Sequence, residues 1–218
     1  MVRVLKLRIG EEVEFVDGAG KRVQAEVVRY TEREVAVSLK RGSSTLGVVS
    51  SSVASARLFV CSAILKQDHF EWLTEKLAEI GVSDLLPLVS ARTIKKDVRL
   101  ERLQALAQEA MEQSEQAVCM RVHAPQDVMG AARFLERQTM KALVCDTGAG
   151  LKRFDEAIAN TSVHAVFIGP EGGWTEEERA FFEKECGYTR VSLGPSFLRG
   201  ETAGILAGYM LRRTRGHV

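Results

Sequence analysis

The sequence predicts an α/β protein in which a mostly parallel sheet carries helices on both faces and follows a small antiparallel β-domain. Three observations lead to this fold class. After residue 56, apolar runs alternate with segments whose apolar residues recur every three or four positions, as in helices. Before residue 56, short alternating apolar and polar runs are separated by turn-forming residues, a pattern typical of antiparallel strands. The composition, 45% hydrophobic and 27% charged, is that of a chain with a packed core.

The first domain is expected to cover residues 1–55 and to form a small antiparallel barrel or sheet. Its strands are predicted at residues 2–7, 13–16, 23–28 and 35–39. The first of these runs alternates apolar and basic residues, as a half-buried strand does, and residues 17–20 are rich in turn formers. Serine-rich stretches between residues 43 and 52 indicate a linker to the second domain.

The second domain, residues 56–218, is predicted to hold the parallel sheet. Strands are expected at residues 57–65, 85–89, 142–146, 163–168 and 190–193. The first of these is apolar over almost its whole length, which is typical of a strand buried on both faces. Because helices separate the strands, the sheet is expected to be mostly parallel.

Helices of the second domain are marked by apolar spacing and by capping residues. The first ends at Gly81, which suits the C′ position, and Thr175 with Glu178 forms a capping box that starts a helix ending near residue 187. The last helix is expected over residues 201–213, with arginines at its negative end. The apolar faces of the first two helices are formed by Phe70, Leu73, Leu77 and Ile80 and by Leu103, Leu106, Ala107, Ala110 and Met111.

Composition and cysteine usage exclude several classes of protein. The net charge is +1, from 30 Lys and Arg against 29 Asp and Glu, so a nucleic acid would be held by local basic patches. The four cysteines form no Cys-x-x-Cys pair, which argues against a metal or redox site. Three of them lie in or beside apolar runs, which predicts buried free thiols. There is no signal peptide and no apolar run of about eighteen residues, so we expect a cytoplasmic protein without a membrane span.

Two loops rich in glycine and proline carry the functional prediction. One covers residues 168–175 and the other residues 193–203, and each follows a predicted strand and precedes a helix. Glycine lets backbone groups approach a ligand closely, and proline fixes the entry angle of the chain. Two such loops can clamp one small molecule between backbone atoms, which indicates a cofactor site. Because neither loop contains lysine, we expect adenine-type hydrogen bonds and apolar packing in place of a phosphate cradle.

The remaining residues favour a reactive cofactor over a protein nucleophile. The Gly-x-x-x-x-Gly-Lys-Ser/Thr and Gly-x-Gly-x-x-Gly motifs are absent, and Gly148-Ala149-Gly150 falls short of the second. The histidines, at positions 69, 123, 164 and 217, are scattered and are expected to be structural or on the surface. Such an enzyme works by positioning a cofactor against its substrate, and methyl transfer from a sulfonium fits because the cofactor carries its own leaving group.

Both loops resemble those of the bacterial ribosomal RNA small subunit methyltransferase E family, which belongs to the SPOUT superfamily of knotted methyltransferases. Shorter blocks elsewhere in residues 66–114 are similar too, and the first domain resembles the family's PUA-like barrel. The resemblance covers nearly the whole chain. Its most specific residues are Ile168-Gly-Pro-Glu-Gly-Gly-Trp-Thr-Glu-Glu-Glu178 and, in the second loop, Leu193-Gly-Pro195, Leu198-Arg199 and Glu201-Thr-Ala203.

This resemblance implies a fold, a cofactor, a partner and a reaction. The fold is an α/β domain with a deep trefoil knot, and the cofactor is S-adenosyl-L-methionine. The family works as a homodimer, paired through the last helix, and methylates N3 of a uridine in 16S rRNA within the small ribosomal subunit. The implied cofactor contacts are Ile168, Gly169, Pro170, Glu171, Gly172, Gly173, Leu193, Gly194, Leu198, Arg199, Thr202 and Ala203.

Arg199 and Glu201 are the candidate catalytic residues. Arg199 is expected to orient the target or to stabilise the uridine oxyanion. The proton is expected to leave either to solvent or to a carboxylate such as Glu201. The alternative for both residues is a local ion pair at a helix start. Basic clusters of this kind are usually solvated faces, but the resemblance favours contact with RNA. The RNA-binding candidates are Arg3, Lys6 and Arg8 in the first domain and Arg92, Lys95 and Lys96 in the second.

Departures from the family pattern leave other functions open. Ser196-Phe197 stand where Arg-Ile is common, Gly200 stands where Thr is common, and Glu115-Gln116 stand where Gly-Arg or Ser-Arg is common. These changes remove positive charge near the expected RNA side. The alternatives are a related knotted methyltransferase with another RNA target, a degenerate RNA-binding or assembly factor without turnover, and an unrelated nucleotide-binding α/β protein.

Overall fold

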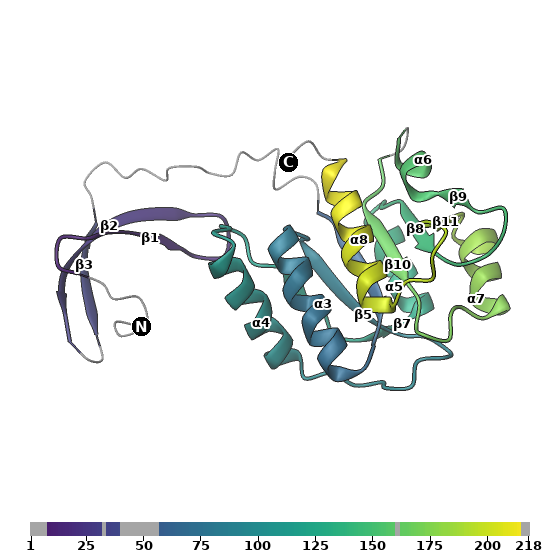
Figure 1. Ribbon diagram of the computed structural model, residues 1–218, viewed down its shortest axis with the longest axis horizontal. Helices are drawn as coiled ribbons and strands as arrows, with labels where there is room; N and C mark the ends of the chain where they lie inside the picture. The colour runs from purple at the N-terminus through teal and green to yellow at the C-terminus, as the bar shows by residue number, and fades with distance from the viewer. Residues whose placement is uncertain (1–7, 32–33, 40–56, 160–161, 215–218) are drawn as a thin grey trace. The chain divides into compact units, whose positions relative to one another are not determined.

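The computed structural model describes residues 8–31, 34–39, 57–159 and 162–214, and the chain divides into two compact units, residues 1–55 and 56–218 (Figure 1). The predicted strand at residues 2–7 and the serine-rich linker lie outside the described residues. No helix among the described residues is long and apolar enough to cross a membrane. The same residues contain no group of three His, Cys, Asp or Glu side chains that could hold a metal ion.

The described part of the first unit is a three-stranded antiparallel sheet in the order β1-β2-β3. The strands are β1 (Glu12–Val16), β2 (Arg22–Tyr30) and β3 (Val35–Leu39). The turn between β1 and β2 is closed by the Asp17 carboxylate, which accepts hydrogen bonds from the backbone N–H groups of Ala19 and Lys21 at 2.7 and 3.0 Å. The prediction of antiparallel strands separated by a turn at residues 17–20 is therefore confirmed.

The second unit contains an eight-stranded sheet in the order β6-β5-β4-β10-β8-β11-β9, with β7 paired to β5. Every strand pair in it is parallel, as predicted. The order reverses between β4 and β10, and ligands of open α/β sheets bind at such switch points. The strands are β4 (Phe59–Ala63), β5 (Asp84–Val89), β6 (Arg121–Val122), β7 (Gln126–Asp127), β8 (Ala142–Cys145), β9 (Lys152–Arg153), β10 (Ala165–Ile168) and β11 (Thr189–Ser192).

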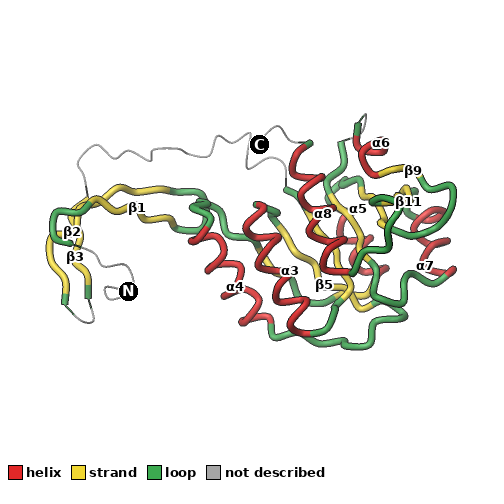
Figure 2. Tube along the Cα trace, viewed as in Figure 1, coloured by secondary structure: helices red, strands yellow, loops and turns green. Residues whose placement is uncertain are grey.

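Helices cover both faces of this sheet, and α3 lies between α4 and α8 (Figures 1 and 2). Alternate residues of β4 enter two different apolar clusters, with Val60 packing under α3, α4 and α8 and Phe59 packing on the side of α5 and η1. This two-sided burial explains why the strand is apolar throughout. The helices are α3 (Gln67–Ile80), α4 (Leu100–Gln113), α5 (Val128–Glu136), α6 (Phe154–Ile158), α7 (Glu176–Ala180), the π-helical turn η1 (Phe181–Glu185) and α8 (Gly200–Arg213).

Local signals located the long helices correctly. Gly81 follows α3 in the left-handed conformation with φ of 83°, and its N–H is bonded to the carbonyl of Ala78. Thr175 and Glu178 form the predicted capping box at the start of α7. That helix is α-helical to Ala180 and continues as the π-helical turn η1 to Glu185, so the chain stays helical almost to the predicted end near residue 187.

The elements that the sequence analysis missed are short and lie between residues 115 and 158. They are β6, β7, α5, β9 and α6. The start of α5 had a readable signal, because Asp127 caps it by accepting a hydrogen bond from the N–H of Gly130 at 2.6 Å. The four cysteines are free, but only Cys61 and Cys145 are buried, whereas Cys119 and Cys186 are half-buried. The trefoil knot stays a prediction.

A glycine stripe allows α8 to lie close to α3 and β4. Gly200, Gly204 and Gly208 recur every fourth residue, and a Cβ atom on any of them would meet a leucine side chain at 2.7 Å. At Gly208 the neighbours are Leu77, Val82 and Val60, all buried. The absence of side chains on this stripe therefore sets the distance between the helix and its neighbours.

Replacing Gly208 by leucine is expected to destabilise the second unit by about 2 kcal/mol. Overpacking a filled core costs roughly 1–3 kcal/mol or more, and the better helix propensity of leucine offsets less than about 1 kcal/mol of it. Urea unfolding followed by tryptophan fluorescence measures the loss, because both tryptophans, Trp72 and Trp174, lie in this unit. The control is Thr202→Leu on the exposed side of the same helix, and equal effects of the two changes would contradict the prediction.

Candidate functional site

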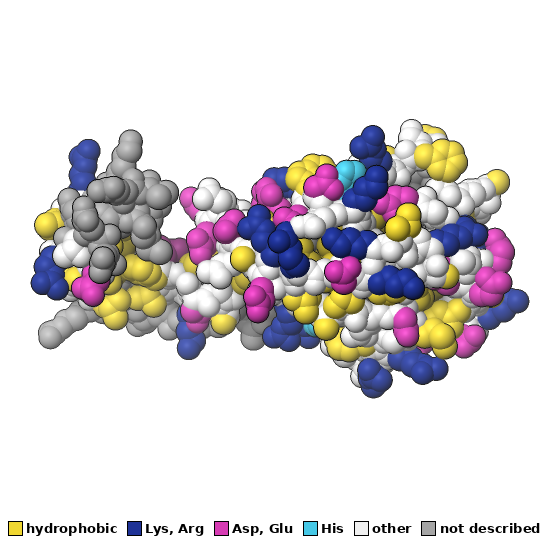
Figure 3. All heavy atoms as spheres, turned by 90° about the horizontal axis from the view of Figure 1, so that it is seen from below, with side chains coloured by type: hydrophobic (Ala, Val, Ile, Leu, Met, Phe, Trp, Pro, Cys, Tyr) yellow, Lys and Arg dark blue, Asp and Glu magenta, His cyan; other side chains and the backbone are white. Residues whose placement is uncertain are grey.

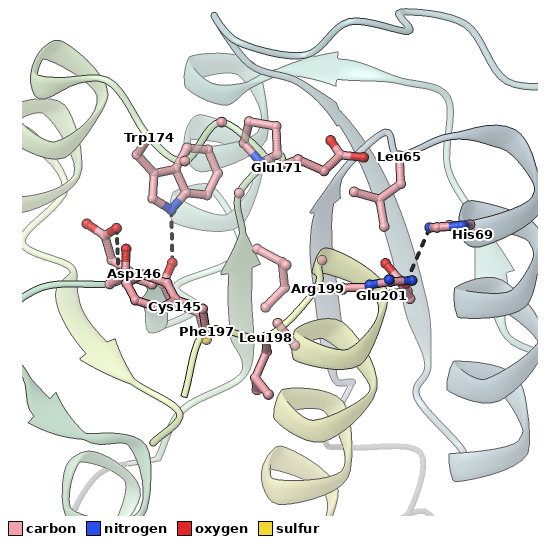
Figure 4. A pocket seen from close by; sticks show the side chains of 18 of the residues that line it. Leu65, His69, Cys145, Asp146, Glu171, Trp174, Phe197, Leu198, Arg199 and Glu201 are labelled. Carbon is pink, nitrogen blue, oxygen red and sulfur yellow. Dashed lines mark hydrogen bonds and ion pairs between the residues drawn. The ribbon is translucent and has the colours of Figure 1, made fainter. Parts of the chain in front are cut away.

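A pocket of about 920 Å³ opens at the carboxyl ends of four parallel strands of the second unit. Its walls are the segments that follow these strands, β4, β8, β10 and β11, together with the first turns of α3 and α8 (Figure 4). Ile94 and Lys95 from the loop after β5 also line it. Both glycine-and-proline loops line it, because β10 and β11 end at the same edge of the sheet. The pocket thus lies where open α/β sheets hold their ligands.

The predicted cofactor residues gather at this one place. Thr202 is the exception, since it is exposed on α8 and does not line the pocket. The candidate catalytic residues Arg199 and Glu201 both line the pocket, and so does Lys95. The lining members of the predicted cofactor set are Ile168, Gly169, Pro170, Glu171, Gly172, Gly173, Leu193, Gly194, Leu198, Arg199 and Ala203.

Trp174 holds the first loop in place. Its ring is buried, and its Nε1–H donates a hydrogen bond to the carbonyl of Cys145 at the end of β8, 2.9 Å away. A Cβ atom at Gly169 would lie 3.1 Å from this ring, so glycine permits the close approach of loop and indole. Gly173, with φ of 68°, closes the turn through a 2.8 Å hydrogen bond from its N–H to the carbonyl of Pro170.

Arg92 and Ala91, in the loop after β5, form hydrogen bonds that hold the first loop and the start of α7. The guanidinium of Arg92 donates a 2.7 Å hydrogen bond to the carbonyl of Gly172. The carboxylate of Glu178 accepts hydrogen bonds of 2.9 Å from the N–H groups of Ala91 and Thr175. Arg92, predicted to bind RNA, therefore supports the backbone of the candidate cofactor loop.

Asp146 joins three segments behind the pocket. Its side chain is 2% exposed and accepts hydrogen bonds from Arg179 Nε at 2.8 Å and from Arg190 Nη1 at 3.0 Å. Burial opposes ionisation of the carboxyl, but the hydrogen bonds from Arg179, the backbone N–H of Thr147 and Arg190 outweigh it and hold the pKa of Asp146 below its usual range. The carboxylate is therefore an ionised anchor for two arginines.

Replacing Asp146 by asparagine is expected to cost about 2–3 kcal/mol at pH 7, because two partly buried guanidinium groups lose their counter-charge. The lowered folded-state pKa means that this stabilisation is complete above the unfolded value near 4 and is lost as the pH falls through the folded value. Denaturation of wild type and variant at pH 7 and at pH 3 should therefore show a difference that shrinks in acid. Glu183→Gln, which removes the half-exposed partner of Arg190, is the control and should cost below about 1 kcal/mol.

The second loop leaves its backbone open toward the pocket. Its turn is held by Ser192, whose Oγ donates to the carbonyl of Gly194 at 2.9 Å. Gly194 has φ of 143°, and no atom lies within 4 Å of the place where its Cβ would stand. Two apolar side chains on the pocket lining are almost fully exposed, Phe197 at 88% and Ile94 at 92%.

Packing explains why glycine stands at position 200, one of the departures from the family pattern. A Cβ atom there would lie 2.7 Å from Cδ2 of Leu65, which is buried beside the pocket. A threonine at this position would require Leu65 to move. The departure therefore belongs to the contact between α8 and the end of β4, and it does not remove a charged group.

Arg199 and Glu201 do not form the local ion pair that was the alternative to a catalytic role. The Arg199 side chain has no polar partner among the described residues, whereas Glu201 is 7% exposed and lies 3.3 Å from Nδ1 of His69. His69 stands in the first turn of α3 and lines the pocket too (Figure 4). The scattered histidines predicted a structural or surface role for His69; its place just after a strand was the available signal of a functional one.

Some basic residues near the pocket are paired with side chains of the same unit, and others are exposed. Arg99 and Arg102 lie 3.1 and 3.4 Å from the carboxylate of Glu71, and Lys95 Nζ lies 3.3 Å from Oε1 of Gln67. Lys96 is exposed, as is Arg8 in the first unit, while Arg3 and Lys6 lie outside the described residues. One face of the second unit shows Lys and Arg interspersed with Asp and Glu, with no single basic patch (Figure 3).

Comparison with protein families identifies both parts of the chain. A model described as an RNA methyltransferase domain matches residues 53–212, and one described as an RNA methyltransferase PUA domain matches residues 1–40. A protein of Synechocystis called ribosomal RNA small subunit methyltransferase E is 31% identical over 216 residues, which cover 94% of this chain and 67% of that protein. The chain belongs to the ribosomal RNA small subunit methyltransferase E family. A Rickettsia conorii protein with the same name is 23% identical and covers 98% of this chain and 85% of its own length.

Solved structures of this family share the fold. A probable rRNA-methyltransferase from Porphyromonas gingivalis superposes with a TM-score of 0.81 at 25% identity, covering 99% of this chain and 89% of that one. A ribosomal RNA small subunit methyltransferase E from Neisseria gonorrhoeae, bound to S-adenosyl methionine, superposes with a TM-score of 0.79 at 25% identity, covering 95% and 84%. The unrelated nucleotide-binding protein considered above is thereby excluded.

Proposed function

We propose that this protein is an S-adenosylmethionine-dependent methyltransferase that methylates N3 of a uridine in 16S rRNA of the small ribosomal subunit. One observation carries the proposal: both glycine-and-proline loops line a single pocket together with Arg199 and Glu201. Membership of the family supports it, as do a relative named for methylation of small-subunit RNA and a relative solved with S-adenosyl methionine.

The pocket suits this cofactor in size and in chemistry. Its volume of about 920 Å³ lies within the range of ~300–1,000 Å³ typical of small-molecule sites. The open backbone at Gly194 lets a planar base lie against the chain, and Ile168, Leu193 and Leu198 offer apolar contacts. The exposed carboxylate of Glu171 offers a counter-charge for a cationic part of the ligand. We therefore assign the lining residues of the two loops, without Thr202, to cofactor binding.

The residues of the protein bind the cofactor and the RNA, accept the proton of uridine N3 and stabilise the charge that develops. S-adenosylmethionine, when bound, supplies an electrophilic methyl group on a sulfonium, and the sulfur becomes a neutral thioether when the methyl group is transferred. N3 of uridine becomes nucleophilic when it loses its proton, and the negative charge then spreads onto the neighbouring carbonyl oxygens. Arg199 stabilises that charge and Glu201 accepts the proton.

RNA binding is assigned to cations on both units. Lys95 and Lys96 stand beside the pocket, and Arg3, Lys6 and Arg8 belong to the segment matched by the PUA model. Arg92 contributes to this surface indirectly, because its guanidinium is hydrogen-bonded to the carbonyl of Gly172 in the first loop. If these side chains neutralise phosphates, affinity for RNA falls steeply with salt, by a slope of about −0.7 to −0.9 per phosphate contact. A flat salt profile would reject the assignment.

We also propose that two copies pair through α8 and that the enzyme works in the cytoplasm. Tyr209 is 41% exposed on α8, and Trp72 on the adjoining α3 is 45% exposed. The half-buried Ile205, Leu206 and Met210 extend this apolar surface. Sedimentation at the mass of a single chain would exclude the dimer.

The deciding experiment uses small ribosomal subunits from a strain that lacks the modification. They are incubated with the protein and S-adenosylmethionine, and the digested RNA is searched for N3-methyluridine by mass spectrometry. Its appearance establishes reaction, substrate and cofactor together. Its absence, with an active relative succeeding in parallel, favours another RNA target if a different methylated nucleotide forms, and a binding factor without turnover if none does.

A further inference from the structure

We propose that the proton of uridine N3 leaves the pocket through Glu201 to His69 and from His69 to solvent. His69 is then a relay residue for the reaction, although it does not touch the substrate. The inference rests on the proposed function and adds a residue that the sequence analysis had set aside. It is carried by the juxtaposition of one buried carboxylate and one half-exposed imidazole at the pocket wall.

Glu201 is the carboxylate best suited to accept the proton. Three carboxylates line the pocket among the described residues: Asp146, Glu171 and Glu201. Asp146 is held ionised by two arginines, so it is a poor base. Glu171 is exposed and has no polar partner among those residues. Glu201 alone is both buried, at 7% exposure, and close to a titratable side chain.

His69 connects this buried carboxylate with the surface. Its Nδ1 lies 3.3 Å from Oε1 of Glu201, while its Nε2 lies 3.7 Å from Oδ2 of Asp68, whose side chain is 82% exposed. The imidazole itself is 34% exposed. The contact between His69 and Glu201 is drawn in Figure 4. One ring nitrogen therefore faces the pocket's carboxylate, and the other faces the solvent side.

The proton step balances without any further reactant. The N3–H bond breaks, and its electron pair stays on nitrogen and forms the new bond to the methyl carbon, whose bonding pair to sulfur remains on sulfur. The proton passes to the Glu201 carboxylate and then to Nδ1 of His69, which releases the proton on Nε2 to water. Neutral imidazole carries one donor and one acceptor nitrogen, so it can take a proton on one side and release one on the other.

Charged groups of both signs surround His69. Asp68 on the same helix and Glu201 on α8 bring negative charge next to the ring. Lys66, Lys95 and Arg199, which line the same pocket, bring positive charge. A separation of 3.3 Å is within the looser range found before a substrate tightens the site.

A purely structural histidine would only neutralise Glu201, so the test must separate charge from proton transfer. His69→Lys keeps a cation beside Glu201 but cannot release a proton at neutral pH. His69→Gln keeps a hydrogen-bonding group without titration. His69→Ala leaves space that added imidazole can fill. Glu75→Gln, further along α3 and paired with Lys76, is the matched control on the same helix.

The experiment measures single-turnover methyl transfer to unmodified small subunits between pH 6 and pH 9.5, with cofactor affinity measured by calorimetry. We expect the lysine and glutamine variants to be about 10²-fold slower at pH 7, with a deficit that shrinks as the pH rises. Cofactor affinity should stay within about threefold, and imidazole should restore the alanine variant. Full activity of His69→Lys, or failure of imidazole to rescue, would overturn the relay. If wild type itself transfers no methyl group, the proposed function has failed and the relay falls with it.

Discussion

Replacing Arg199 by alanine is expected to slow methyl transfer by about 10²–10³-fold, the usual effect of removing one charge-stabilising donor from an active site. The guanidinium lines the pocket and has no competing partner among the described residues. Arg199 also stands at the N-cap of α8, a 14-residue helix whose positive end adds to the same field. Negative charge that develops on uridine would therefore be stabilised by both groups.

The measurement is the rate of transfer of a radioactive methyl group to small subunits at saturating cofactor. Arg199→Lys should fall between wild type and alanine, because lysine keeps the charge but not the planar fork of donors. Arg213→Ala, at the exposed end of the same helix, is the control and should leave the rate unchanged. Cofactor affinity should change far less than the rate. An alanine variant with full turnover would remove Arg199 from the catalytic assignment.

Replacing Asp84 by alanine is expected to destabilise the second unit by about 3 kcal/mol, the lower end of the range for breaking a buried ion pair. The Asp84 side chain is 1% exposed and accepts hydrogen bonds from Nε of Arg57 at 2.9 Å, from Nη2 of Arg57, and from Nε2 of His123 at 2.7 Å. Without the carboxylate, both partners lose their acceptor. The loss stays at the lower end because Arg57 is 38% exposed and can still reach water.

The surroundings of Asp84 make this loss measurable. Arg57 also stacks over the ring of Phe59, 4.8 Å from its centroid, and His123 packs against Phe59 and Phe134. Urea unfolding followed by tryptophan fluorescence gives the free energy. The control is Asp155→Asn, which breaks an exposed pair with Arg153 and should leave the free energy of unfolding nearly unchanged. If both variants lose the same small amount of unfolding free energy, the contacts of Asp84 with Arg57 and His123 do not stabilise this end of the sheet.

Elements whose signals are local could be predicted from the amino-acid sequence. The spacing of Phe70, Leu73 and Leu77 places α3, and Thr175 with Glu178 starts α7, because these contacts form within one or two helical turns. The parallel sheet followed from the same patterns, since strands separated by helices run in one direction. The composition of the two glycine-and-proline loops predicted that they clamp one small molecule, and the structure brings both to one pocket. Short elements such as α5 escaped, because nine residues carry little periodic signal.

Contacts between side chains that are distant in the sequence became known from the folded chain. Glu201 faces His69 because α8 lies against α3 along its glycine stripe, and no sequence pattern relates two residues so far apart. The same holds for Arg92 in the loop after β5, which contacts Gly172 in the loop after β10, and for Asp146, which pairs with Arg179 and Arg190. Such pairs depend on strand order and helix packing, and these are set by the sum of many weak contacts along the chain. Local chemistry therefore marked the loops, whereas the packing of the sheet and its helices selected the groups that face the pocket.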